Sequence, residues 1–181
     1  MAGRKVFIQM GGSKTAKSGK RRRSVFAGAM RGKSAEEIAS RAVAETRKAA
    51  EGGDARACYL MGLAYAEGSG VRQNAEESFQ WFARAADLGL PEAQCQAAAM
   101  CHTGSGCPQD SVRAAAWWRS AAEQDEPLAM CCYGLALFRG DGVARDRLQG
   151  FNLLRRAAKL GVPEAAVVLR TAEMIEFAMQ C

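Results

Sequence analysis

Seven cysteines and a single histidine are the side chains of this sequence best suited to metal binding or nucleophilic chemistry. Cys95, Cys101, His102 and Cys107 share one stretch, "CQAAAMCHTGSGC", which could ligate zinc or pair a thiol with an imidazole. Zinc sites favour cysteines separated by two residues, whereas five residues separate these. We therefore expect no metal, no cofactor and no catalytic residue, and interpret the cysteines as small buried thiols of a reducing compartment.

Two glycine-rich stretches could instead hold a phosphate. "GAMRGKS", residues 28–34, resembles a P-loop but has three residues between its glycines where that motif has four. "GSGCPQD", residues 104–110, follows no strand-forming run. We interpret the first as a linker into a helix capped by Ser34 and Glu37, and the second as a chain reversal.

The first 33 residues form a basic arm, with ten Lys or Arg and no acidic residue, whereas the rest carries 15 basic and 19 acidic residues. The densest part is "KTAKSGKRRR". Such a run is typical of a solvated tail, a nuclear-import signal, an organelle-targeting segment or an arm that neutralises nucleic-acid phosphates. The cations that would act are Lys14, Lys17, Lys20, Arg21, Arg22 and Arg23.

The sequence that contains these side chains repeats with a period of 36 residues and no insertion. Apolar positions keep the same register, as in Trp81, Trp117 and Leu153. The other recurring residues are Gly68, Gly104 and Gly140; Gly70, Gly106 and Gly142; Ala85-Ala86, Ala121-Ala122 and Ala157-Ala158; and Pro91, Pro127 and Pro163. "GSGCPQD" is therefore one copy of a repeated turn.

Helical spacing of apolar residues on both sides of this turn predicts a helix pair in each unit. Asn74, Asp110 and Asp146 follow the turn and are expected to cap the second helix, with Glu77 and Gln149 completing capping boxes. At its end, Gly89 and Gly161 suit a left-handed C-cap. The three prolines then fit the first turn of the next unit.

Strings such as "YLMGLAYAEGSGVRQNAEESFQWFARAADLG" resemble Sel1-like repeats, relatives of the tetratricopeptide repeat. The resemblance covers Gly53 to Gly161 and implies an all-α fold, an α-α superhelix of about three helix-turn-helix repeats with degenerate terminal helices. Some secreted relatives staple each unit with two cysteines eight residues apart. The first staple positions here are Ala50, Ala86, Ala122 and Ala158, so that staple is not expected.

The domain organisation that follows has four parts. Residues 1–33 are the basic arm, expected to be extended or disordered, and residues 34–53 a degenerate N-terminal repeat helix. Residues 54–161 are three full repeats, and residues 162–181 a C-terminal capping helix.

Stacked helix pairs leave a concave groove lined mainly by the first helix of each unit, which suits a peptide or a partner helix. We therefore expect a non-catalytic scaffold that binds other proteins, with the arm used for targeting or anchoring. The alternative is a structural subunit of a ribonucleoprotein, such as an organellar ribosome, whose arm contacts RNA phosphates. The predicted groove residues are Arg56, Leu60, Leu63, Glu67, Gln96, Ala99, Thr103, Cys132, Leu135 and Arg139.

Hydropathy indicates no role in a membrane, because no apolar run approaches the roughly 18 to 20 residues of a membrane-spanning helix. The N-terminus also lacks the apolar segment of a secretory signal. We expect an intracellular, reducing location in an organelle such as the mitochondrion, in the nucleus or in the cytoplasm.

Overall fold

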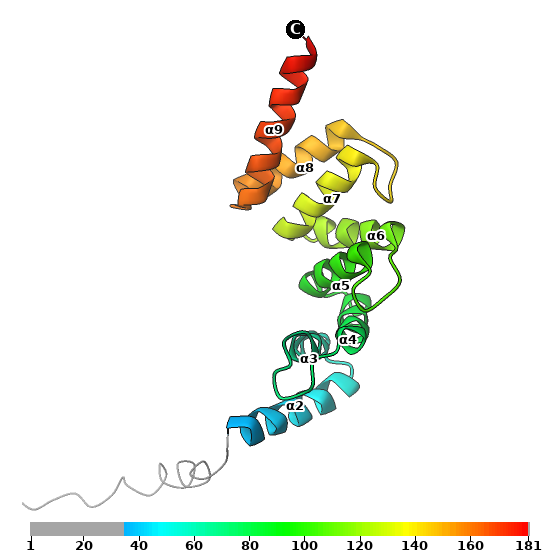
Figure 1. Ribbon diagram of the computed structural model, residues 1–181, viewed down its shortest axis with the longest axis vertical. Coiled ribbons are helices and arrows are strands. Elements are labelled where there is room, and N and C mark those ends of the chain that lie inside the picture. Colours follow the sequence, from blue (N-terminus) through cyan, green and yellow to red (C-terminus); the bar gives the residue numbers. More distant parts are fainter. Residues whose placement is uncertain (1–34, 181) are drawn as a thin grey trace, which may run out of the picture. The chain divides into compact units, whose positions relative to one another are not determined.

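The structure, a computed structural model, describes the backbone of residues 35–180 and the side chains of residues 37–171. Within that range the chain forms eight α-helices and no strand (Figure 1). The helices are α2 (Ala35–Glu51), α3 (Ala55–Glu67), α4 (Ala75–Asp87), α5 (Pro91–Thr103), α6 (Ser111–Glu123), α7 (Pro127–Arg139), α8 (Arg147–Lys159) and α9 (Pro163–Gln180).

The helices stack in chain order, each packed mainly against the helix before it and the helix after it (Figure 1). The three full repeats are the pairs α3–α4, α5–α6 and α7–α8, which alternate first and second helices along the stack. The predicted all-α repeat architecture is confirmed for the described residues. Among those residues, no helix has both the length and the hydropathy to cross a membrane.

The core between the helices is built largely from alanine, with a few large side chains at repeat positions. Phe82, Trp118 and Leu154 occupy one such position and are all buried. Phe79 and Trp117 meet edge-on across neighbouring repeats, with ring centroids 6.3 Å apart. Small residues let the helices of a pair approach closely, and the apolar area buried there stabilises the stack.

The turn between paired helices depends on both of its glycines. Gly104 and Gly106 have φ of 76° and 74°, a region that is costly for other residues. A Cβ on Gly106 would collide with the carbonyl oxygen of Ala75, and one on Gly142 would collide with that of Ser111. Each turn therefore reverses the chain and also docks its second glycine onto the start of the preceding second helix.

The side-chain caps of the second helices form as predicted. The Oδ1 atom of Asn74 accepts from the amides of Glu76 and Glu77, at 3.0 and 3.3 Å. The capping boxes predicted for Glu77 and Gln149 are wrong, because the amide of Asn74 donates to the carbonyl of Tyr65 at 3.0 Å instead of to Glu77. The amide of Asp146 likewise donates to Leu137, which leaves Gln149 without that role.

The second helices end on a residue in the left-handed conformation. Gly89 and Gly161 have φ of 89° and 91°, as predicted. The equivalent residue of the middle repeat is Asp125, whose φ is 64°. Asp tolerates this conformation better than most residues because its short side chain bonds locally, but it does so at a cost that glycine avoids.

Candidate functional site

All ten predicted groove residues lie on the first helices α3, α5 and α7, and all are at least partly exposed. All of them except Arg56 fall at three positions that recur with the repeat, so that each helix presents these members on the same face. Leu60 is the most exposed large apolar side chain among them, at 49%. Exposed side chains are common on any protein surface, so the pockets on this face are better evidence for a binding site.

One hollow, the N-terminal pocket, lies between α2 and α3. Its volume is about 370 Å³, and α3 contributes Leu60, Leu63 and Glu67, three of the predicted groove residues. Opposite them, α2 contributes small and apolar side chains, including Ala39 and Val43. The lining is therefore mostly apolar, with a carboxylate at the edge.

A second hollow, the C-terminal pocket, has a volume of about 210 Å³ and contains three more predicted groove residues of α7: Cys132, Leu135 and Arg139. His102 and Trp118 close its other side. The three α7 residues stand two repeats after the three α3 residues of the N-terminal pocket. The two pockets are thus the same place in the fold, repeated along the stack.

The repetition preserves the apolar floor and changes the charge at the edge. Leu63 and Leu135 are equivalent, and both line their pockets. Glu67 of the N-terminal pocket becomes Arg139 in the C-terminal pocket. Asp141 also lines the C-terminal pocket, at the position of Ser69. A ligand that spans both pockets would therefore place apolar groups in each and meet a carboxylate at the first and charges of both signs at the second.

His102 is the most unusual polar residue of the C-terminal pocket. Its Nδ1 atom is buried and has no hydrogen-bond partner, and the nearest carboxylate oxygen, on Asp141, is 3.6 Å away. The centroid of its ring lies 5.4 Å from the centroid of the Trp118 ring. Asp141 belongs to the turn of the next repeat, and no pattern in the sequence marked it as a neighbour of His102.

The cysteines do not gather into a metal site in the described part of the chain, where no three His, Cys, Asp or Glu side chains are arranged to hold an ion. Of the four zinc candidates, Cys101 and Cys107 meet, with their sulfur atoms 3.5 Å apart. Burial raises the pKa of Cys95 to about 12, with Glu126 and Cys132 adding to the effect. Such thiols are protonated at neutral pH and are weak nucleophiles and ligands.

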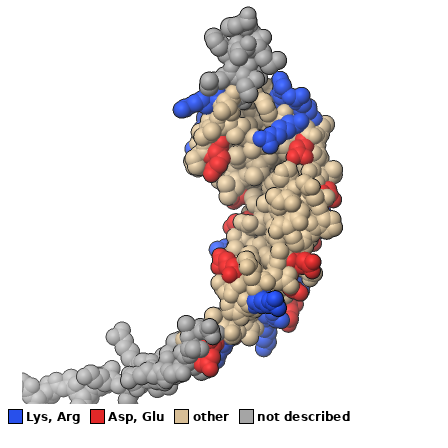
Figure 2. Space-filling model, viewed as in Figure 1, with Lys and Arg blue, Asp and Glu red and all other residues tan. Residues whose placement is uncertain are grey.

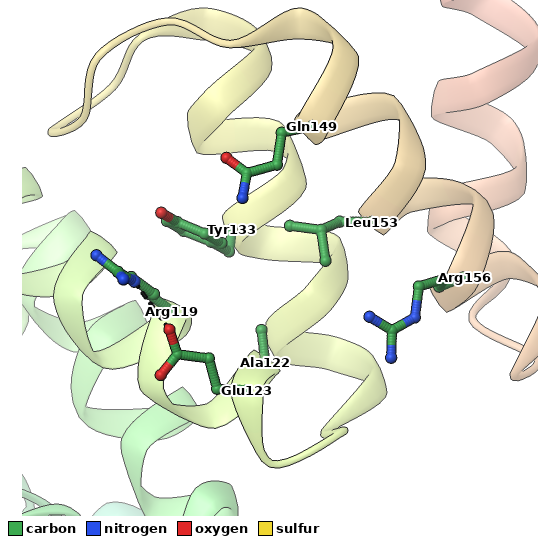
Figure 3. A pocket seen from close by; sticks show the side chains of 7 residues that line it. All are labelled: Arg119, Ala122, Glu123, Tyr133, Gln149, Leu153 and Arg156. Carbon is green, nitrogen blue, oxygen red and sulfur yellow. Dashed lines mark hydrogen bonds and ion pairs between the residues drawn. The ribbon is translucent and has the colours of Figure 1, made fainter.

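A third hollow, of about 390 Å³, was not foreseen and lies between α6 and α8 (Figure 3). Arg119 and Glu123 of α6 pair across one side at 2.9 Å, and the ring of Tyr133 stands beside them. From α8, Leu153 forms part of the floor, and Arg156 reaches toward the opposite edge (Figure 3).

The origin of this third hollow is visible when neighbouring repeats are compared. One repeat earlier, Trp117 fills the equivalent crossing by packing on Phe79, and Arg113 lies 4.4 Å above the ring centroid of Trp117. Here Leu153 and Ala115 occupy the positions of Trp117 and Phe79. Of these two smaller residues, Leu153 lines the hollow, so the loss of the tryptophan ring at its position leaves space there.

The surface charge shows no basic stripe on the face of the repeats seen in Figure 2, where acidic and basic side chains are interspersed among broad uncharged areas. A nucleic-acid-binding face would gather cations along one side. The six arm cations predicted for targeting or RNA contact, and the "GAMRGKS" stretch, lie outside the described residues.

Comparison with solved structures finds the same repeat architecture. A protective antigen of uropathogenic Escherichia coli with an SLR fold is 38% identical (TM-score 0.64), over 66% of this chain and 26% of that one. A Sel1 repeat protein from Oxalobacter formigenes is 30% identical (TM-score 0.66), over 72% and 98% of the two chains. Helicobacter pylori cysteine rich protein B shares the fold at 20% identity (TM-score 0.59), over 76% and 99%.

The family assignment rests on the repeats themselves. No curated protein matches the chain significantly. The Sel1 repeat model matches residues 55–90, 91–126 and 129–162, which together are more than half of the sequence. These matches follow the three helix pairs α3–α4, α5–α6 and α7–α8. The chain therefore belongs to the Sel1 repeat family.

Proposed function

We propose that this protein is a non-catalytic scaffold that binds an extended peptide or a helix of another protein along its first helices. The observation that carries the proposal is the recurrence of one apolar pocket two repeats apart, at Leu63 and again at Leu135. Sel1 repeat proteins are generally protein-interaction scaffolds, which agrees with this role.

The chemistry of the pockets favours a peptide over a small polar substrate. Leucine and alanine line both pockets, and Trp118 adds an aromatic ring to the C-terminal one. The charged groups are Glu67 in the first pocket and Arg139 with Asp141 in the second. Apolar floors bind side chains by removing them from water, and edge charges select the partner and its direction. Pockets at a fixed separation would bind anchor residues at a matching separation in the partner.

Substitution of the pocket floors tests the proposal. Peptides displayed on phage would be selected against the whole protein, and the affinity of the best binders measured by calorimetry for Leu63→Glu and Leu135→Glu. Each substitution puts a charge into an apolar pocket, so each should weaken binding by at least tenfold. The matched control is Leu148→Glu on α8, a leucine that is 75% exposed and outside both pockets.

The control decides how the result is interpreted. Equal losses for Leu148→Glu and the two pocket variants would mean that the effect is general and that the binding face is elsewhere. Unchanged affinity in Leu63→Glu and Leu135→Glu, with Leu148→Glu also unchanged, would contradict the groove. Far-ultraviolet circular dichroism of each variant would show that the helices are intact.

A further inference from the structure

Cys101 and Cys107 are a pair of free thiols held against each other across one turn. Cys101 lies in the last turn of α5 and is buried, and Cys107 lies in the following loop and is partly exposed. Their sulfur atoms are 3.5 Å apart, with the thiol of Cys107 donating to the sulfur of Cys101. A disulfide needs about 2.05 Å between the sulfurs, so closing the gap takes roughly 1.5 Å of movement.

The repeat explains why these two residues meet. The equivalent pairs are Tyr65 with Val71 and Leu137 with Val143, apolar residues at the same two positions of the other repeats. In the middle repeat two cysteines take their place.

The backbone around the pair is fixed from two sides. Gly106 is docked against Ala75 of the preceding repeat, and the amide of Asp110 donates to the carbonyl of Cys101 at 2.9 Å. Because the loop is anchored at both of these points, the two thiols are held together by the fold and do not have to search for each other.

We propose that Cys101 and Cys107 form an oxidation site, at which a low-molecular-weight disulfide such as oxidised glutathione converts the two thiols into an intramolecular disulfide. The partly exposed Cys107 loses its proton to solvent, and its thiolate attacks one sulfur of the oxidant. One glutathione thiolate leaves, and a mixed disulfide remains on Cys107. The thiolate of Cys101 then attacks the sulfur of Cys107 and releases the second glutathione.

The electrons and protons balance in this sequence. The two protein thiols lose two electrons and two protons, and one oxidised glutathione takes up both to become two thiols. Burial raises the pKa of Cys101 to about 11, with its contact to Cys107 adding to the effect, so the second attack is the slower one at neutral pH. Raising the pH should speed it.

The other described cysteines are less well placed for a bond. The thiol of Cys58 donates to the carbonyl of Ala50 at 3.5 Å, so its hydrogen-bond partner is an oxygen and not a second sulfur. Cys95 and Cys132 are near enough for Cys132 to raise the pKa of Cys95, but no hydrogen bond joins their sulfurs. A Cys95–Cys132 bond is therefore the competing product that the test must distinguish.

The test is an equilibration of the whole protein with mixtures of oxidised and reduced glutathione at pH 8. Acid quenching, alkylation with N-ethylmaleimide in urea, where buried thiols also react, and tandem mass spectrometry would then locate the bond. We expect Cys101 and Cys107 to be unalkylated and the peptide that contains them to be lighter by two hydrogens. Cys95 should be alkylated. The equilibrium constant against glutathione should be at least tenfold higher in the native protein than in urea.

Two variants complete the experiment. Cys107→Val restores the residue of the other repeats, should fold, and should abolish the bond. Cys95→Ala should leave it unchanged. The proposal is overturned by a Cys95–Cys132 product, by alkylation of both Cys101 and Cys107 at every glutathione ratio, or by equal equilibrium constants in the native and unfolded chains.

Discussion

Arg156 of α8 donates a 2.8 Å hydrogen bond to the carboxylate of Asp125, which has the φ of 64° at the position that glycine occupies in the other repeats. The contact joins the end of one second helix to the next second helix. Both side chains are well exposed, at 58% and 76%, so the ion pair itself adds little stability. The strained backbone of Asp125 is the larger effect.

Replacing Asp125 tests that balance. Asp125→Gly and Asp125→Asn both remove the ion pair, but only glycine relieves the left-handed backbone. We expect Asp125→Gly to be more stable than Asp125→Asn by about 0.5 to 1 kcal/mol, measured by urea unfolding. Equal stability of the two variants would show that Asn and Gly accept this φ equally well here.

The docked glycine of the turn should be far less replaceable than a glycine that only supplies a positive φ. Gly89 has φ of 89°, and a Cβ added there would have no atom within 4 Å, so Gly89→Ala should cost about 1 to 2 kcal/mol. In Gly106→Ala the same backbone cost is joined by the collision with Ala75. We expect a loss at least about 2 kcal/mol larger than for Gly89→Ala, measured by urea unfolding, and similar losses would contradict the docking contact.

Filling the third hollow should stabilise the protein. Leu153→Trp restores the aromatic residue of the other two repeats, in a space of about 390 Å³. We expect the free energy of unfolding to rise by about 1 kcal/mol through added buried apolar area. The reciprocal change, Trp117→Leu, opens a hollow at the filled crossing and should cost about 2 kcal/mol. A loss of stability in Leu153→Trp would mean that Tyr133 already uses the space.

The buried thiols predict a loss of stability at alkaline pH. Burial raises the pKa of Cys95 to about 12 and that of Cys132 to about 11, whereas thiols of the unfolded chain lose their protons near 9. Above pH 9 the unfolded chain therefore binds fewer protons than the folded one, and stability falls as pH rises through 11. Each thiol contributes a slope of up to about 1.4 kcal/mol per pH unit.

Comparing slopes isolates the thiols from the other groups that titrate at high pH. Urea midpoints of the wild type and of a Cys95→Ala/Cys132→Ala variant would be followed from about pH 7 to about pH 10.5, a range that brackets the thiol pKa of the unfolded chain. The variant should lose stability less steeply above that pKa, although it begins less stable. Parallel curves would show that these two thiols keep ordinary pKa values.

The features that recur could be predicted from the sequence, whereas those that depend on a contact between different repeats could not. The 36-residue register located the helix pairs, the glycine turns and the N-caps, because each arises within one unit. The meeting of His102 with Asp141 joins two units. The hollow lined by Leu153 also joins two units, although a comparison of Leu153 with Trp117 in the register would have indicated it.

The capping boxes failed for a related reason. Glu77 has the right spacing from Asn74, but the amide that it would bind already donates to Tyr65 within the turn. The spacing of Asn74 and Glu77 is a local pattern, whereas the hydrogen bond to Tyr65 spans the whole turn. The amides of Asp110 and Asp146 make the equivalent bond in the other repeats. Tertiary geometry, which spacing does not contain, decides between such partners.

The docking of Gly106 on Ala75, and of Gly142 on Ser111, gives the stack a direction, because each turn rests on the unit before it. In a chain with a second copy of residues 91–126 inserted after residue 126, the turn of the copy would rest on Ser111, as Gly142 now does, and Gly142 would rest on the Ser111 of the copy. The molecule would then be one step longer, and its N-terminal and C-terminal pockets would match partner anchors that stand farther apart.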